Sequence, residues 1–255
     1  MLTRDEVGVA VTYEKGPTFS GARLEDADFS HARLHAPNFE GARITDAWLR
    51  DADVWGDLEG LRLNGIEVAP LVEAERTRLF PELARLRATD PQGLAAAWTM
   101  IEDLWRATVA RARNLGEVAL HVRVDDEWSF VETQRHLILA TDCWLRRMVK
   151  GIARPYHPLG LAGSWLTDPH GWGLDTTADP SLEDVLAVRR DRMDEVAHEI
   201  ATMTTVELDR VCVPPSTIGH PTREHTVLEC LHVILNEEWE HHRYATRDLA
   251  MLEGD

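Results

Sequence analysis

The N-terminal part of the chain carries a large apolar residue at every fifth position, and this period restricts the backbone more than any other feature of the sequence. Eight such residues follow one another without a slip: Phe19, Leu24, Phe29, Leu34, Phe39, Ile44, Leu49 and Val54. A helix repeats every 3.6 residues and a strand every two, so neither produces a period of five. A coil that turns one corner every five residues places each large side chain toward its axis, and the pattern therefore predicts a solenoid.

Small residues accompany this period and lead to a family resemblance. Two positions before seven of the large residues stand Ala22, Ala27, Ala32, Pro37, Ala42, Ala47 and Ala52, which fill the space beside the axis. Blocks such as Ala27 to His31 resemble the pentapeptide-repeat family. That resemblance implies a right-handed quadrilateral β-helix with four repeats per coil. The repeats would make only about two coils, and short solenoids are marginally stable, so we expect support from the rest of the protein.

The five-residue period fades after Gly60, and a connector follows. Gly60, the pair Asn64-Gly65 and Pro70 interrupt the chain there, as turn residues do. From residue 71 to residue 87 the sequence predicts a helix with a break near Pro81.

The remainder of the chain predicts four amphipathic helices. Each has a recognisable start, and these starts are Asp90-Pro91, Ser129 with Glu132, Ser181 with Asp184, and Thr226 with Glu229. Long second and third connections between such helices are typical of a four-helix bundle. We therefore expect a multidomain α and β protein, with a repeat domain at residues 1–60, a connector at 61–89 and a four-helix bundle at 90–255.

The last helix has two polar residues on its apolar face. The face consists of Leu228, Leu231, Leu235, Glu238, His242, Ala245, Leu249 and Leu252. Glu238 and His242 are four residues apart, so their side chains lie side by side. Because a buried carboxylate requires a compensating cation or hydrogen bonds, this pair predicts a metal site.

His136 borders the apolar face of the second helix and offers a third ligand. His136, Glu238 and His242 together are a set of the kind that holds catalytic zinc with one open position. Nickel or ferrous iron would suit the same donors. The alternatives are a hydrogen-bonded histidine at a helix edge for His136, and an arginine from another helix that pairs with Glu238 and His242.

A second register competes for the metal. Glu237 and His241 are also four residues apart, on a stripe that continues through Ile234, Tyr244 and Asp248. This stripe is mostly polar, which favours a solvated flank of the helix. We therefore prefer Glu238 and His242 as ligands, with His241 as a supporting group.

These residues carry a second resemblance. Residues 127–129 (Glu-Trp-Ser) followed by His136, and residues 241–243 (His-His-Arg), resemble the DinB-like superfamily. That resemblance implies a four-helix bundle from about residue 90 onward, with a histidine triad around zinc or nickel. In many members the last helix supplies two histidines four apart. Here the first is Glu238, which is similar to the His, Glu, His zinc set of the mycothiol-dependent maleylpyruvate isomerases.

The resemblance also implies a chemistry. A low-molecular-weight thiol such as mycothiol or bacillithiol would bind the metal as thiolate and attack an electrophilic small molecule, with the three side chains acting as ligands only. We expect a thiol S-transferase or a hydrolase, and the sequence identifies no catalytic residue and no thiol pocket. The isomerases carry a further C-terminal domain and this chain ends at Asp255, so isomerase activity is not expected.

The charge balance limits the partners. There are 27 Lys+Arg against 44 Asp+Glu, a formal net charge of −17, which argues against binding to nucleic acid or to an anionic membrane. Three distant cysteines and no apolar run of membrane length favour a cytoplasmic protein. We expect a small-molecule substrate and, from the resemblance, a homodimer.

Two further readings stay open. Residues 151–180 form a long loop that either closes over a site or covers one end of the bundle. The alternative function is a non-catalytic binding or scaffold protein with the repeat coil as its interaction module. A DNA mimic that occupies gyrase is less favoured, because four arginines stud the coil: Arg23, Arg33, Arg43 and Arg50.

Overall fold

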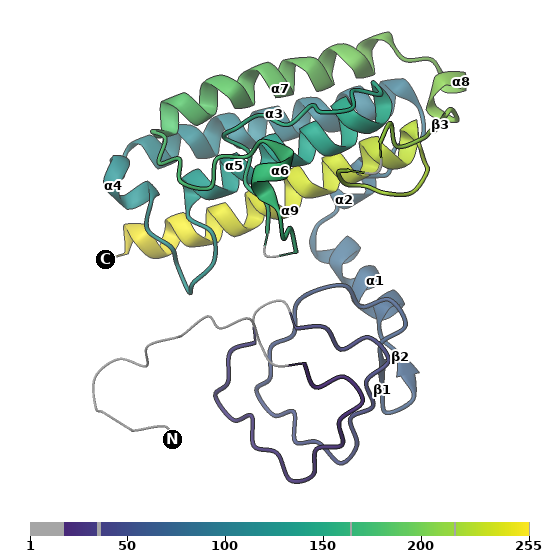
Figure 1. The fold of residues 1–255 in the computed structure, drawn as a ribbon, viewed down its shortest axis with the longest axis vertical. Helices are drawn as coiled ribbons and strands as arrows, with labels where there is room; N and C mark the ends of the chain where they lie inside the picture. The colour runs from purple at the N-terminus through teal and green to yellow at the C-terminus, as the bar shows by residue number, and fades with distance from the viewer. Residues whose placement is uncertain (1–17, 35–36, 164, 217, 255) are drawn as a thin grey trace. The chain divides into compact units, whose positions relative to one another are not determined.

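The computed structural model describes residues 18–34, 37–163, 165–216 and 218–254 (Figure 1). The chain divides into two compact units, Met1–Arg50 and Asp51–Asp255. Residues 1–17, which the sequence assigns to the repeat domain and whose lack of an apolar run supported the cytoplasmic prediction, lie outside the described residues. The domain boundaries predicted after residues 60 and 89 stay predictions.

The backbone of the repeat segment turns a corner every five residues. A residue with positive φ recurs two positions after a large apolar residue, at Gly21, Asp26, His31, Gly41, Asp46, Asp51 and Gly56. Backbone hydrogen bonds close alternate corners, as from Ala22 N to Phe19 O at 2.9 Å and from Ala32 N to Phe29 O at 3.0 Å. Only glycine adopts positive φ freely, and aspartate, asparagine and histidine are the side chains that tolerate it best, which explains the composition of the corners.

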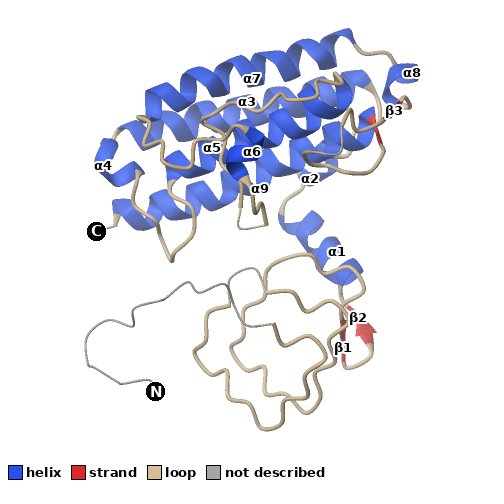
Figure 2. Ribbon diagram, in the orientation of Figure 1, coloured by secondary structure: helices blue, strands red, loops and turns tan. Residues whose placement is uncertain are grey.

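The large apolar residues of the repeats, which the sequence places toward the axis of the coil, are not buried. From Phe19 to Val54 the eight residues are each between 54% and 68% exposed. A repeat buries its apolar face only against its neighbours, so a coil this short leaves much of that face uncovered. The described residues between 18 and 60 form turns and no strands, as Figure 2 shows in tan.

The connector contains a hairpin and two helices. Strands β1 (Arg62–Leu63) and β2 (Ile66–Glu67) pair antiparallel around Asn64 and Gly65, which have φ of 49° and 81° as two-residue hairpin turns require. Helices α1 (Ala69–Leu79) and α2 (Leu83–Leu86) follow. The predicted break near Pro81 is confirmed.

The rest of the chain is helical. Its four long helical segments are α3 (Pro91–Arg113), α5 (Phe130–Thr141) continued by the π-helix η1 (Asp142–Val149), α7 (Leu182–Thr202) and α9 (Val227–Glu253). Between them lie the short helices α4 (Glu117–Leu120), α6 (Pro169–Trp172) and α8 (Thr205–Leu208), and a two-stranded antiparallel pair of β3 (Val211–Cys212) with β4 (His225–Thr226).

All four predicted helix starts are confirmed by their caps. The Asp90 side chain accepts a hydrogen bond from Gly93 N at 3.0 Å. Ser129 and Thr226 each form a capping box with a glutamate three residues later, and Ser181 caps α7. Such caps satisfy backbone N–H groups that the first helical turn leaves without partners.

The four long segments enclose one apolar core. Segments α3 and α5 each pack against both α7 and α9, and η1 packs against α9 (Figure 1). Core residues at most 1% exposed come from all of them and include Leu94, Ile101, Leu137, Leu145, Val185, Leu231 and Leu249. The three cysteines are buried and form no disulfide. Among the described residues, no helix has both the length and the apolar character needed to cross a membrane.

Candidate metal centre

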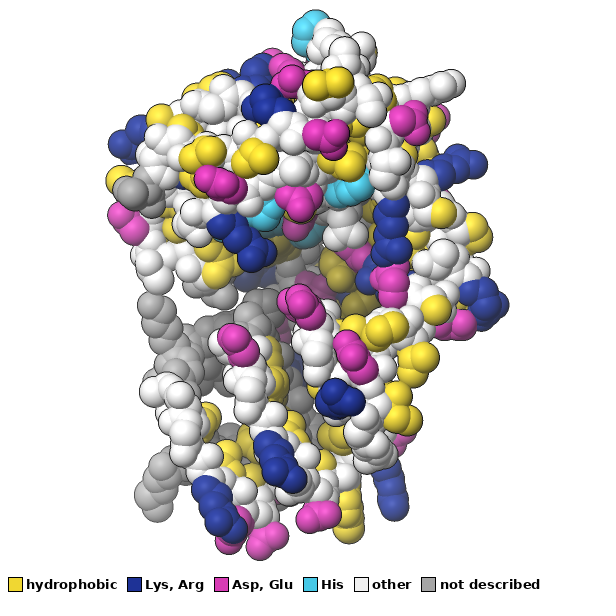
Figure 3. Space-filling model, turned by 90° about the vertical axis from the view of Figure 1, so that its right-hand side faces the viewer, with side chains coloured by type: hydrophobic (Ala, Val, Ile, Leu, Met, Phe, Trp, Pro, Cys, Tyr) yellow, Lys and Arg dark blue, Asp and Glu magenta, His cyan; other side chains and the backbone are white. Residues whose placement is uncertain are grey.

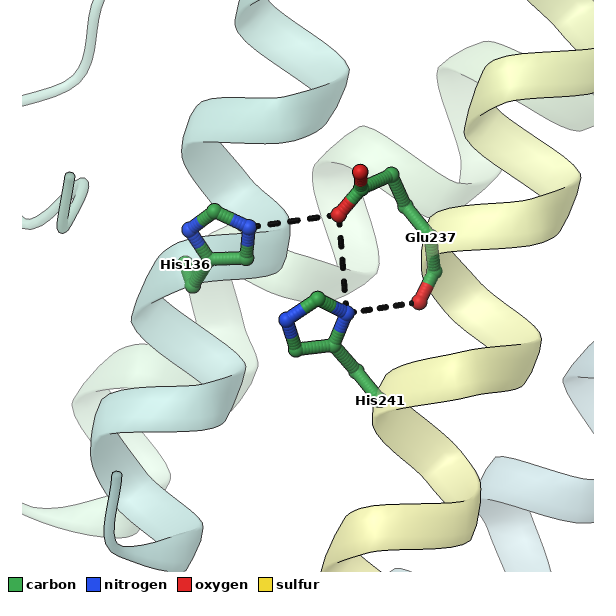
Figure 4. Close-up of side chains that lie close together, drawn as sticks. All are labelled: His136, Glu237 and His241. Carbon is green, nitrogen blue, oxygen red and sulfur yellow. Dashed lines mark hydrogen bonds and ion pairs between the residues drawn. The ribbon is translucent and has the colours of Figure 1, made fainter. Parts of the chain in front are cut away.

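Three side chains from α5 and α9 converge beside the core. His136 lies on α5, and Glu237 and His241 lie one turn apart on α9, so their side chains point toward the same space (Figure 4). One potential ligand atom from each lies within 4.8 Å of the other two. No other group of three or more histidine, cysteine, aspartate and glutamate side chains in the described part of the chain is placed to share an ion.

Hydrogen bonds to backbone carbonyls orient both imidazole rings. His136 Nδ1 lies 3.1 Å from Leu161 O, and His241 Nδ1 lies 2.9 Å from Glu237 O. With Nδ1–H as the donor, Nε2 of a neutral His136 keeps its lone pair and faces Glu237. In His241, Nδ1 is also the nitrogen that lies 3.5 Å from Glu237 Oε2. A carbonyl that fixes the tautomer in this way is the usual support of a metal-binding histidine.

The distance between His136 and Glu237 tests whether a cation fits. His136 Nε2 lies 3.2 Å from Glu237 Oε2. Because Nδ1 already holds the proton of a neutral His136, two lone-pair acceptors would face each other, which is unfavourable unless a cation lies between them. Either a second proton on His136 or a metal ion meets this requirement. Two imidazoles and one carboxylate are donors that a divalent metal accepts, so the three residues fit such an ion.

The three side chains of the centre are partly exposed to solvent. The side chains of His136, Glu237 and His241 are 14%, 31% and 16% exposed, so a small molecule could approach beside the carboxylate. Burial, with a contribution from nearby His136, lowers the pKa of His241 to about 4, which keeps this ring neutral at pH 7. Burial acts to raise the pKa of Glu237, but the contact with His136 and the positive charges that His136 and His241 carry when protonated outweigh it, so the pKa is lowered. Both directions favour the forms that bind metal.

The predicted ligands Glu238 and His242 are not brought to this cluster. Glu238 is 1% exposed and accepts two hydrogen bonds from Arg189 of α7, at 2.9 Å and 2.7 Å. His242 Nε2 lies 2.8 Å from Thr108 Oγ1, and its ring contacts Trp105 of α3. The structure therefore brings His136 together with Glu237 and His241, the register that the sequence placed second, and does not bring Glu238 and His242 to His136.

The physical reason is that an arginine, not a metal, compensates the buried carboxylate. The stripe of α9 with Glu238 does face the core, as predicted, and Arg189 meets it there with only 2% of its side chain exposed. A signal for this pairing stood in the sequence: Val185, Arg189, Arg192 and Val196 are spaced as one face of α7, so two arginines lie on its apolar stripe. Paired with Arg189, Glu238 needs no metal.

An indole covers one side of the centre. Trp128 precedes α5, and its ring centroid lies 4.4 Å from that of His136 and 6.0 Å from that of His241. The two histidine rings stack on each other at 4.6 Å. The sequence marks Trp128 only through the Glu-Trp-Ser segment that resembles the DinB-like superfamily, because nothing in its local pattern reveals a distant stacking partner.

The long loop between η1 and α7 lies beside the same centre. Arg135, next to His136, holds the loop by donating to Leu159 O, Asp175 O and Ala178 O at 2.9–3.0 Å. Leu161 of this loop supplies the carbonyl that orients His136. The loop is thus fixed against α5 and forms part of the candidate site. Figure 3 shows histidine side chains at the surface of the helical unit among acidic and basic side chains.

Comparisons with known proteins agree with both resemblances seen in the sequence. A family model described as the DinB superfamily matches residues 100–245, a range that includes His136, Glu237 and His241. A model described as pentapeptide repeats in nine copies matches residues 19–58. The searches of curated proteins and of solved structures returned no match.

Proposed function

The chain belongs to the DinB superfamily, and on this premise we propose that it is a divalent-metal-dependent enzyme of the thiol S-transferase or hydrolase type. The superfamily is usually metal-binding. The observation that carries the proposal is the convergence of His136, Glu237 and His241 within 4.8 Å. Two imidazoles and one carboxylate suit zinc or nickel, and leave a position for a reactant.

Each residue of the centre has a defined task in this proposal. His136 and His241 present ring nitrogens, and Glu237 presents a carboxylate oxygen. The carbonyls of Leu161 and Glu237 keep the rings in the required orientation. Trp128 excludes water from the side of the centre that it covers. A metal held here would lower the pKa of a thiol or a water molecule that binds beside these ligands.

The substrates follow from the same chemistry. In the transferase reaction, a low-molecular-weight thiol such as mycothiol or bacillithiol would lose its proton to solvent. Its sulfur then forms a bond to an electrophilic carbon, and the leaving group departs with the electron pair of the broken bond. In the hydrolase reaction, water replaces the thiol as nucleophile. None of the three ligands is asked to act as nucleophile.

Metal content tests this proposal and separates the two registers. Protein purified without an affinity tag and incubated with zinc or nickel should retain about one metal ion per chain. Glu237→Gln and His241→Asn should each lose most of it, because each removes one of three ligands. His242→Asn is the matched control, one residue away on the same helix, and should keep the metal.

Two results would contradict the choice of ligands or the enzyme proposal itself. Metal retained by His241→Asn and lost by His242→Asn would restore the register with Glu238 and His242 as ligands. No metal in the wild type with either ion would end the enzyme proposal. If metal binds, thiol consumption in the presence of electrophiles then separates transferase from hydrolase activity.

The fold of each part of the chain, its location, its oligomeric state and its partners are also proposed. We infer that α3, α5 with η1, α7 and α9 correspond to the superfamily's four-helix bundle, and that the repeats form a right-handed quadrilateral coil; an experimental structure would test both. A cytoplasmic location, a homodimer, and a small-molecule substrate without nucleic-acid or membrane partners are likewise proposed, the dimer being testable by sedimentation.

One observation favours a second function. The large apolar residues of the repeats are more than half exposed, as a surface for binding another protein would require. A non-catalytic binding or scaffold protein would keep its partner when the three metal ligands are replaced. An enzyme would lose its reaction in those variants.

A further inference from the structure

Three aromatic side chains of the helical unit pack on one another and a fourth, Trp128, lies near them across Gly163; we define the aromatic wall as Trp128, Tyr156, Trp165 and Trp172. Tyr156 stacks on Trp172 with centroids 4.6 Å apart and an angle of 21° between the rings. Trp172 contacts the edge of Trp165 at 5.7 Å. Three of these rings belong to the long loop, which α6 interrupts.

A glycine joins Trp165 to Trp128. A β-carbon placed on Gly163 would lie 3.0 Å from Trp165 Cδ1 and 3.9 Å from Trp128 Cζ2, so both indoles border this glycine. The wall reaches the metal centre at Trp128, which packs against His136 at 4.4 Å. Two residues before Gly163, the Leu161 carbonyl faces the same histidine.

The wall is exposed at one place. Trp165 is 53% exposed, whereas Trp128, Tyr156 and Trp172 are partly buried. Single exposed apolar residues are common on protein surfaces, but this indole packs on Trp172 and borders Gly163, whose other neighbour, Trp128, covers the candidate centre. A flat ligand that covers Trp165 would remove apolar surface from water and gain the ring contact as well.

The positive charge of a metal held at the centre would limit which flat ligand can bind beside it. Aromatic rings bind cations as well as other rings, but a divalent metal held by His136, Glu237 and His241 would repel a cationic ligand beside it. We propose that the aromatic wall binds a neutral planar aromatic group, and that the electrophilic substrate of this site carries such a group, stacked on Trp165. This inference rests on the proposed function, because it names the substrate class of the same centre.

Ligand binding tests the inference without any reaction. The probe is 2-naphthamide, with decahydronaphthalene-2-carboxamide as the saturated analogue of similar size. Dissociation constants of the full chain, measured by ligand-detected NMR with and without zinc, should favour the planar probe. Trp165→Ala should bind 2-naphthamide about three- to tenfold more weakly, the range that loss of one aromatic contact implies.

Trp48→Ala is the matched control, because Trp48 is an indole that is 89% exposed and lies in the other unit. This variant should bind as the wild type does, and Trp165→Phe should retain part of the affinity. Both tryptophans are more than half exposed, so neither alanine variant is expected to unfold.

Three results would overturn the inference: equal binding of the two amides, wild-type affinity in Trp165→Ala, or tighter binding of the phenyltrimethylammonium cation than of 2-naphthamide by the zinc-loaded protein. The proposed function fails separately. If no metal binds but 2-naphthamide still depends on Trp165, the aromatic wall stands as a ligand site and the metal enzyme does not.

Discussion

Glu237 and Glu238 are consecutive carboxylates with opposite surroundings. Glu238 points into the core and is held by the guanidinium of Arg189. Glu237 points to the edge of α9, where two histidines and partial exposure give it the environment of a ligand. A step of one residue along a helix turns the side chain by about 100°, so neighbours meet different partners.

The Glu238→Ala variant should therefore lose stability and keep its metal. The substitution leaves the Arg189 guanidinium buried without its carboxylate, which costs about 3–5 kcal/mol in comparable cases. Urea unfolding of the metal-free protein measures the loss, and metal content is measured on the folded fraction. Glu237→Ala is the control and should change the unfolding free energy of metal-free protein much less. Equal destabilisation by the two substitutions would contradict this assignment of roles.

Gly219 is a second residue whose identity matters. Its φ is +118°, and a β-carbon there would lie 2.1 Å from Tyr156 Oη and 2.8 Å from Arg147 Cζ. Gly219→Ala should destabilise the protein by about 1–3 kcal/mol, since backbone strain and a clash with buried groups combine. Gly173→Ala provides the comparison, because φ is +87° there but the space is open. Thermal unfolding of both variants should show the larger loss at Gly219, and the reverse order would mean that the loop yields easily.

At the scale of helices and strands, features that depend on residues within one turn could be predicted from the sequence. Features that depend on contacts between distant residues could not. The starts of α3, α5, α7 and α9 could be predicted because a cap depends on residues within one turn. The buried stripe of α9 could be predicted from its spacing. Which polar pair of α9 lies beside His136 could not be predicted, because it depends on Arg189 of another helix and on the loop carbonyl of Leu161. The exposure of the repeat residues was also missed, since period alone does not tell how much neighbouring coils cover.

The long loop offers a prediction at this scale. Arg135 donates to three of its carbonyls, at Leu159, Asp175 and Ala178. Arg135→Met should leave those carbonyls without their partner and increase amide hydrogen exchange across residues 159–178. Arg154→Met is the control, because the exposed Arg154 makes one such bond, to Gly171 O at 2.7 Å. Unchanged exchange in Arg135→Met would show that the loop is held by its apolar contacts alone.

At the scale of the whole molecule, metal binding should be visible as stability. A ligand that binds only the folded state stabilises it by about 2.7 kcal/mol at a free concentration one hundred times its dissociation constant. Zinc should therefore raise the unfolding temperature of the wild type and of His242→Asn, and should leave that of His241→Asn nearly unchanged. A rise of the same size in all three proteins would place the zinc elsewhere.

The corner that recurs at every fifth residue also limits how the repeat segment can change in length. Each corner residue stands at a fixed count from the large apolar residue before it, from Gly21 after Phe19 to Gly56 after Val54. Removing one residue would place the residue after each later corner at the positive-φ position. At most corners that residue is alanine, which resists positive φ. Adding or removing five residues would keep every corner residue at its position, so the repeat segment can change in length only by whole repeats.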